Sequence, residues 1–71
     1  MAKVIKAHIT GTVWKIEVKV GDAVTEGTVV AILESMKMEM PVESEDEGKV
    51  TAILCAEGQA VTEGAPLVEL D

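Results

Sequence analysis

The sequence predicts an all-β fold, a barrel or sandwich made of two similar halves, and three observations lead to this prediction. The 71-residue chain repeats itself at an offset of 37 positions. Short segments rich in β-branched residues recur along the chain between glycine-containing turns, as is typical of barrels and sandwiches. No segment has the convincing periodicity of an amphipathic helix.

The internal repeat is without mismatch over five residues. The segment Ala-Val-Thr-Glu-Gly occupies residues 23–27 and again residues 60–64. Two copies are too few for a solenoid, because such arrays need more repeats to bury a continuous core. We therefore expect the two halves, roughly residues 1–34 and 38–71, to have about four short strands each. They should be related by a pseudo-two-fold axis and pack their apolar faces against each other.

Six segments are expected to be strands. The clearest is 12–20, where Trp14, Ile16, Val18 and Val20 alternate with charged residues, because a period of two indicates a half-buried strand. We expect Trp14 to help fill the core. The other predicted strands, in chain order, are residues 4–9, 29–34, 38–44, 50–55 and 66–70.

The connections between these strands carry glycine at matching positions of the two halves. Gly21 corresponds to Gly58, and Gly27 corresponds to Gly64. Since glycine adopts positive φ without a steric penalty, we expect turns with positive φ at these four residues. The acidic segment 43–48 joins the halves and is expected to be a solvated loop.

Composition limits both the partners and the chemistry of the chain. Its length predicts one domain, residues 1–71, with a thin core. A single cysteine excludes an internal disulfide, and the absence of any Cys and His cluster argues against a metal site. The net charge of −7, without arginine, and the single aromatic residue argue against nucleic-acid binding and favour a monomer.

Localisation signals are absent from the sequence as printed. The N-terminal residues lack the apolar run of a signal peptide, and no stretch approaches the length of a membrane span. We expect a complete cytoplasmic gene product that does not bind membranes.

Lys37 lies where the two halves meet, within the segment Glu-Ser-Met-Lys-Met at residues 34–38. Few residues separate Leu33 from Pro41, so the connection must be tight and should place Lys37 on an exposed hairpin tip. By residue type alone, a surface lysine is unremarkable. Its position at the joint, between two methionines, predicts an attachment point.

The residues beside Lys37 allow two interpretations. Met36, Met38 and Met40 follow a period of two and should share one strand face. Met36 and Met38 are expected to be recognised by modifying enzymes, the alternative being core packing, which is the role expected for Met40. Glu34 and Ser35 either tune that recognition or serve only as turn residues.

Two other residues, Cys55 and His8, have reactive side chains, but the sequence shows no catalytic partner for either. Cys55 corresponds to Val18 in the repeat and is expected to be a buried, small apolar residue. His8 is expected on the surface or at a strand edge. The sequence contains neither a His/Asp/Ser set nor a pair of carboxylates placed for acid–base chemistry, so no catalytic residue is predicted.

The segment 34–38, in the middle of a two-fold β-repeat, resembles the attachment site of the biotinyl/lipoyl carrier domain family. Met-Lys-Met is the biotinylation signature of that family, whereas lipoyl domains typically carry Asp-Lys-Ala. The resemblance covers the whole chain, including a Gly-Asp-x-Val-x-x-Gly turn at 21–27, and is strongest to stand-alone attachment proteins and small biotin carboxyl carrier subunits. It implies a flattened β-barrel, a barrel-sandwich hybrid without the thumb insertion of longer carriers.

The resemblance also implies a function. A biotin protein ligase would attach biotin to Lys37, and the biotin would carry CO2 from a biotin carboxylase to a carboxyltransferase. The chain would then be a non-catalytic subunit of a biotin-dependent carboxylase acting on acetyl-CoA or another acceptor. Two alternatives stay open: a carrier of lipoate or of both cofactors, and a small interaction module whose Lys37 is never modified.

Overall fold

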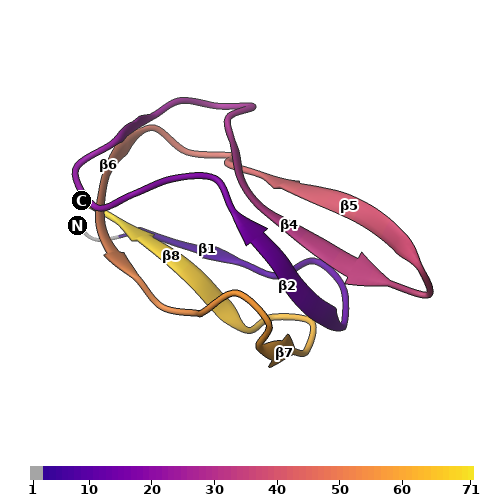
Figure 1. The fold of residues 1–71 in the computed structure, drawn as a ribbon. Helices are drawn as coiled ribbons and strands as arrows, with labels where there is room; N and C mark the ends of the chain where they lie inside the picture. Colours follow the sequence, from indigo (N-terminus) through magenta and orange to yellow (C-terminus); the bar gives the residue numbers. More distant parts are fainter. Residues whose placement is uncertain (1–2) are drawn as a thin grey trace.

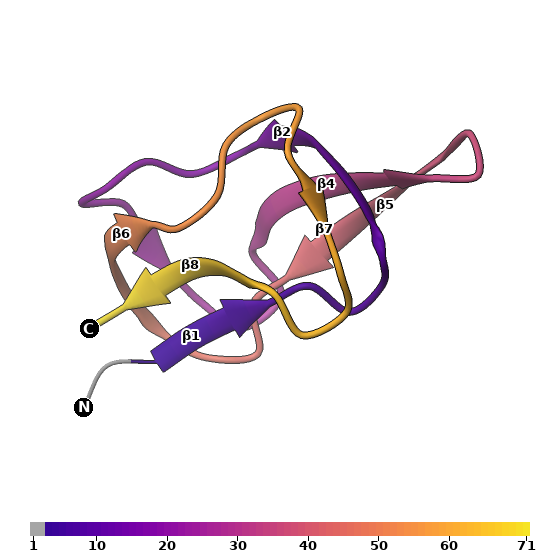
Figure 2. The same cartoon turned by 90° about the horizontal axis from the view of Figure 1, so that it is seen from below.

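The structure, a computed structural model, describes residues 3–71, and within them eight strands form two antiparallel four-stranded sheets (Figures 1 and 2). The first sheet has the strand order β1-β8-β6-β3 and the second has the order β5-β4-β2-β7. The strands are β1 (Lys3–Lys6), β2 (Gly11–Ile16), β3 (Ala23–Val24), β4 (Val29–Ser35), β5 (Met38–Glu43), β6 (Gly48–Ile53), β7 (Ala60–Val61) and β8 (Pro66–Leu70). None of the described residues forms a helix that could cross a membrane.

The predicted pseudo-two-fold symmetry is confirmed and goes further than expected. An offset of 37 maps β2 onto β6 and β3 onto β7 residue for residue, and it maps the order of one sheet onto that of the other. Each sheet contains two strands from each half of the chain. The halves therefore interlock by exchanging strands: β2 pairs with β4 and β6 with β8 within one half, whereas β1, β3 and β7 pair only with strands of the other half.

The core lies between the sheets and draws on both halves. Leu33 and Leu70, which correspond in the repeat, are both fully buried, as are Val30 and Leu67. Because equivalent positions from the two halves meet here, neither half could close this core alone. The buried apolar residues are Ile5, Ala7, Val13, Val18, Val24, Val30, Ala31, Leu33, Val42, Val50, Val61, Leu67, Val68 and Leu70.

Trp14 does not fill the core, so that prediction was wrong. The register between β2 and β4 shifts between Val13 and Lys15, which marks a β-bulge. The bulge reverses the inward and outward alternation, so Val13 is fully buried and Trp14 is 48% exposed. The strand also ends before Val20, which is exposed, and the regular strand expected over 12–20 is therefore shorter and kinked.

The turn predictions are confirmed for the glycines and incomplete elsewhere. Gly21, Gly27, Gly58 and Gly64 all have positive φ, between 87° and 96°. The prediction of about four strands in each half is confirmed. The places of the two-residue strands β3 and β7 were not predicted, because two residues are too few to show a period.

The acidic segment 43–48 was expected to be a solvated loop, and this prediction was wrong for the start of the segment. Ser44 within it is buried, with 2% exposure. Its Oγ donates to the carbonyl of Asp46 at 2.6 Å and accepts the Asp46 N–H at 3.1 Å. The Gly27 N–H donates to the Ser44 carbonyl, and the Ser44 N–H donates to the Thr28 carbonyl. The start of this loop is thus fixed to the β3–β4 turn.

Candidate functional site

Lys37 occupies the end of the hairpin formed by β4 and β5, as predicted. Ser35 pairs with Met38, so the turn consists of Met36 and Lys37 alone. The hairpin tip lies at the opposite end of the molecule from the two termini (Figure 1), and Figure 2 shows it reaching beyond the other strands. The pseudo-two-fold arrangement therefore leaves one connected end for the tip and one open end for the termini.

The backbone of this turn has an uncommon conformation. Met36 and Lys37 have φ values of 52° and 63°, although neither is glycine. A two-residue hairpin turn of type I′ requires positive φ at both central residues, because only then does its twist match that of the strands. Left-handed conformation costs an ordinary residue roughly 1–2 kcal/mol. The paired strands impose this conformation, so the direction in which Lys37 leaves the hairpin is set by the backbone.

The methionines are only partly where the sequence placed them. Met36 lies in the turn and is 91% exposed, so it does not share a strand face with Met38 and Met40, and that expectation was wrong. Met38 is 57% exposed, and Met40 is more buried than Met38 but does not belong to the fully buried core. Alternation along β5 puts Met38 and Met40 on the same face as the buried Val42. Both exposed methionines are thus available to a protein that approaches the tip.

Glu34 and Ser35 form the last part of β4 before the turn. Glu34 is exposed and pairs with Thr12 of β2 on one side and with Glu39 of β5 on the other. Carboxylates that face each other across two strands repel, so this pair places negative charge beside the tip without stabilising the hairpin. The structure brings Glu34, Ser35, Met36 and Met38 together around Lys37, as the sequence had placed them.

Gly11 is a residue of the site that the sequence analysis did not single out. A Cβ at this position would lie 2.5 Å from the Glu34 carbonyl oxygen and 3.4 Å from the Ser35 Cβ. Because real Cβ atoms do not come so close to a backbone oxygen, only glycine lets β2 lie against the base of the hairpin. The repeat could have indicated this residue, because its counterpart Gly48 is also glycine and also lies close to its neighbours: a Cβ there would lie 2.8 Å from Asp71 Oδ1 and 3.2 Å from the Asp71 carbonyl oxygen.

We expect Gly11→Ala to move the hairpin tip. The added methyl group must push the end of β4 outward, and overpacking of this kind costs about 1–3 kcal/mol of unfolding free energy. Amide NMR shifts should change at residues 34–38 in Gly11→Ala. In the matched variant Gly48→Ala they should change around Asp71 instead. Equal shifts at the tip in both variants would contradict a local role for Gly11.

The remaining reactive side chains lie away from the tip. Cys55 is partly buried against the core rather than fully buried, and burial raises the pKa of its thiol, which keeps it protonated at neutral pH. His8 is exposed in the β1–β2 connection, as expected. In residues 3–71, no group of three His, Cys, Asp or Glu side chains could hold a metal ion. What the tip presents chemically is one primary amine.

Comparison with known proteins gives consistent matches over the full length of the chain. A biotin/lipoyl family model, described as "Biotin-requiring enzyme", matches residues 1–70. The chain is 44% identical over 66 residues to the Biotin/lipoyl attachment protein of Bacillus subtilis (strain 168), covering 93% of this chain and 90% of that protein.

Other matches are to parts of much larger proteins. The chain is 37% identical over 70 residues to the propionyl-CoA carboxylase alpha chain of Homo sapiens, of which it covers 10%. The crystal structure of the Kluyveromyces lactis urea carboxylase superposes with a TM-score of 0.92 at 37% identity, over all of this chain and 6% of that one. The chain thus spans nearly all of the attachment protein but only a small part of each carboxylase.

Proposed function

This chain belongs to the biotin/lipoyl attachment domain family, and from that premise we propose that it carries biotin on Lys37 as the carboxyl carrier of a biotin-dependent carboxylase. Its relatedness to the biotinyl domains of carboxylases covers the whole chain. The observation that carries the proposal is the position of Lys37, exposed on a two-residue turn at the joint of the two halves.

A group can be attached covalently at the tip without disturbing the core, because the residues of the turn are not part of the core. Met36 and Lys37 are exposed, and the fully buried residue of β4 nearest to the turn is Leu33. A modifying enzyme can therefore reach the Lys37 amine without unfolding the hairpin. The paired strands behind the turn keep the backbone of Lys37 at a fixed distance from the body of the carrier.

The attachment step uses the Lys37 amine as a nucleophile. In its unprotonated form, Nζ attacks the acyl carbon of biotinyl-adenylate made by a biotin protein ligase. A C–N amide bond forms, the bond from that carbon to the phosphate oxygen breaks, AMP leaves, and the amine nitrogen gives up a proton to solvent or to a base of the ligase. The chain itself supplies no acid or base to this step.

As a carrier, the chain contributes position rather than catalysis. Biotin, when attached, supplies the ring nitrogen that accepts CO2, at the expense of ATP and bicarbonate in a biotin carboxylase, for delivery to a carboxyltransferase. The Lys37 side chain and the attached biotin would form a long tether that starts at the hairpin tip. Tethering converts two bimolecular encounters into local searches at high effective concentration.

We further propose that residues 1–71 act as one domain and as a monomer. The shared core supports a single unit, because each sheet needs strands from both halves. The net charge of −7 disfavours self-association. Sedimentation of the isolated chain at several concentrations tests both points.

We propose biotin rather than lipoate, because Met-Lys-Met at residues 36–38 resembles the biotinylation signature of the family. Co-expression of the chain with a biotin protein ligase and, separately, with a lipoate ligase, followed by intact-mass measurement, tests this choice. We expect a single biotinyl adduct with the first ligase. A lipoyl adduct alone would identify a lipoyl carrier, and no adduct with either ligase would favour the unmodified interaction module.

We expect Met36→Ala and Met38→Ala to impair biotinylation without unfolding the chain. Both side chains are exposed, so each variant should change the unfolding free energy by no more than about 0.5 kcal/mol. Loss of an apolar contact with the ligase should lower kcat/KM for modification by about tenfold. Met40→Ala, at a half-buried position, should instead lower stability. If Met36→Ala or Met38→Ala unfolded the chain, the methionines would be core residues.

A further inference from the structure

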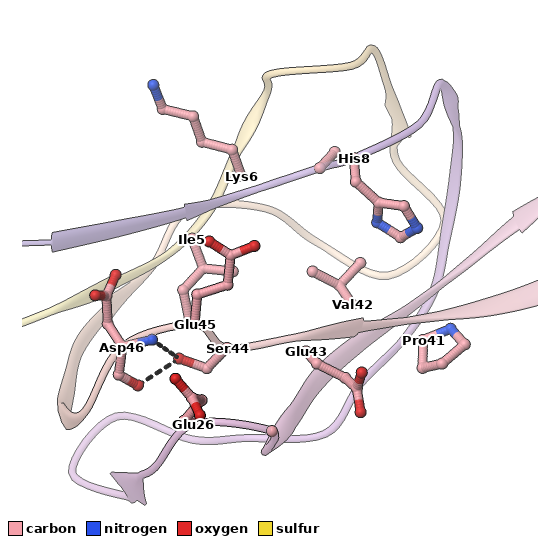
Figure 3. Close-up of a pocket in the computed structure, with 12 residues that line it drawn as sticks. Ile5, Lys6, His8, Glu26, Pro41, Val42, Glu43, Ser44, Glu45 and Asp46 are labelled. Carbon is pink, nitrogen blue, oxygen red and sulfur yellow. Dashed lines mark hydrogen bonds between the residues drawn. The ribbon is translucent and has the colours of Figure 1, made fainter.

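A groove of about 540 Å³ lies between β1 and β5, away from the tip (Figure 3). These two strands are the edges of their respective sheets, so each has one side without a neighbouring strand. The floor is apolar and includes the buried side chains of Ile5, Ala7 and Val42. The proposed carrier function uses none of these residues.

The groove lies on the pseudo-two-fold axis of the molecule. Residues 5–8, which are the last two residues of β1 and the two that follow it, line one side, and their counterparts in the repeat, residues 42–45, line the other. The backbone is the same on both sides, but the charges differ. Lys6 and His8 on the first side correspond to Glu43 and Glu45 on the second.

The two strand edges are not equally suited to pair with another strand. Pro41, on β5, has no N–H and so blunts that edge, as proline commonly does on edge strands. Its counterpart on β1 is Val4, which keeps its N–H and is 38% exposed. An extended segment that enters the groove can therefore extend the first sheet through β1, whereas on β5 it would lack one hydrogen-bond donor.

The far rim of the groove is acidic and open to solvent. Glu26, Glu45 and Asp46 line it and are exposed, and Asp46 makes its hydrogen bonds to Ser44 through its backbone. Figure 3 shows the Glu45 side chain directed toward β1. The ammonium of Lys3, on β1, already reaches the backbone carbonyl of Glu47 in the same loop. A lysine from a strand lying in the groove could reach the carboxylates in the same way.

We propose that this groove binds an extended segment bearing lysine or arginine, which pairs with the free edge of β1 and places its cations against Glu26, Glu45 and Asp46. Strand addition of this kind provides affinity through main-chain hydrogen bonds, and the side chains provide specificity. The proposal rests on the carrier function for the identity of the partner, which is the biotin carboxylase.

Distance from the tip favours the carboxylase over the ligase. Val42 is five residues from Lys37 along β5, which corresponds to about 16 Å of strand. A ligase must bring its active site onto the Lys37 amine itself. A carboxylase acts on the far end of a long flexible arm and can therefore hold the body of the carrier.

The first experiment measures KM of the biotin carboxylase for biotinylated carrier variants. Glu26→Gln with Glu45→Gln should raise KM by about three- to tenfold, the effect of losing two exposed ion pairs, with kcat unchanged and a weaker dependence on salt. The matched variant, Glu17→Gln with Glu63→Gln, loses the same charge at two exposed residues that do not line the groove, and it should change KM by less than twofold. Equal changes in both variants, or none in either, would overturn the proposal.

A second experiment tests the groove without any cofactor. The isotope-labelled, unmodified chain is titrated with a synthetic peptide of alternating lysine and valine. Saturable amide NMR shifts are expected at residues 4–7 and 45–46, and they should be lost in Glu26→Gln with Glu45→Gln. A glutamate–valine peptide should cause none. If these shifts are absent although Lys37 accepts biotin, the groove proposal fails while the carrier function stands; if they appear in a chain that takes no biotin, only the carrier function fails.

Discussion

Lys37→Arg is expected to abolish covalent modification completely while leaving the fold unchanged. A guanidinium stays protonated at all accessible pH values, so it offers no lone pair to attack an acyl-adenylate. Arginine keeps the positive charge and the long side chain at an exposed turn. The unfolding free energy should therefore change by less than about 0.5 kcal/mol.

Intact-mass measurement after co-expression with a biotin protein ligase checks this result. Lys15→Arg is the matched control, because Lys15 is also exposed but lies on β2 away from the tip. The control should carry one biotinyl group, and Lys37→Arg should carry none. A biotinyl group on Lys37→Arg would place the attachment site at another lysine and would remove the basis for the proposed function.

The symmetry of the fold could be predicted because it is written in the sequence as a repeat. Matching glycines such as Gly21 and Gly58 mark equivalent turns, and both have positive φ as expected. The exchange of strands between the halves was not predictable, because a repeat shows which segments are alike but not which segments pair. The bulge at Trp14 was missed for a related reason. Alternation shows only that a strand has two faces, and one extra residue opposite β4 exchanges them.

The position of the hairpin tip could be predicted from the length of the connecting segment, but the backbone geometry of the tip could not. The shortness of the segment between Leu33 and Pro41 required a tight turn that includes Lys37. The left-handed backbone conformation of Met36 could not be predicted from the sequence. Methionine has no preference for that conformation, and the pairing of the strands imposes it. The need for glycine at position 11 could not be predicted either, because the contact that requires it joins residues far apart in the sequence.

The hairpin separates the turn that carries Lys37 from the buried part of β4 that stabilises the chain, and the buried part should respond very differently to mutation. Leu33→Ala removes a fully buried side chain that pairs across to Met40 at the base of the hairpin. Such truncations cost about 2–5 kcal/mol. A chain of 71 residues has a total stability of about 4–11 kcal/mol, at 0.05–0.15 kcal/mol per residue.

Leu33→Ala is therefore expected to remove a large part of the stability of the carrier, and chemical denaturation followed by Trp14 fluorescence or circular dichroism measures the loss. Leu54→Ala is the matched control, because Leu54 is 41% exposed and its truncation should cost less than about 1 kcal/mol. Similar denaturation midpoints for the two variants would contradict the core described above. Because β4 runs directly from Leu33 to the turn, Leu33→Ala should also lose biotinylation as the hairpin base unfolds, whereas Leu54→Ala should retain it.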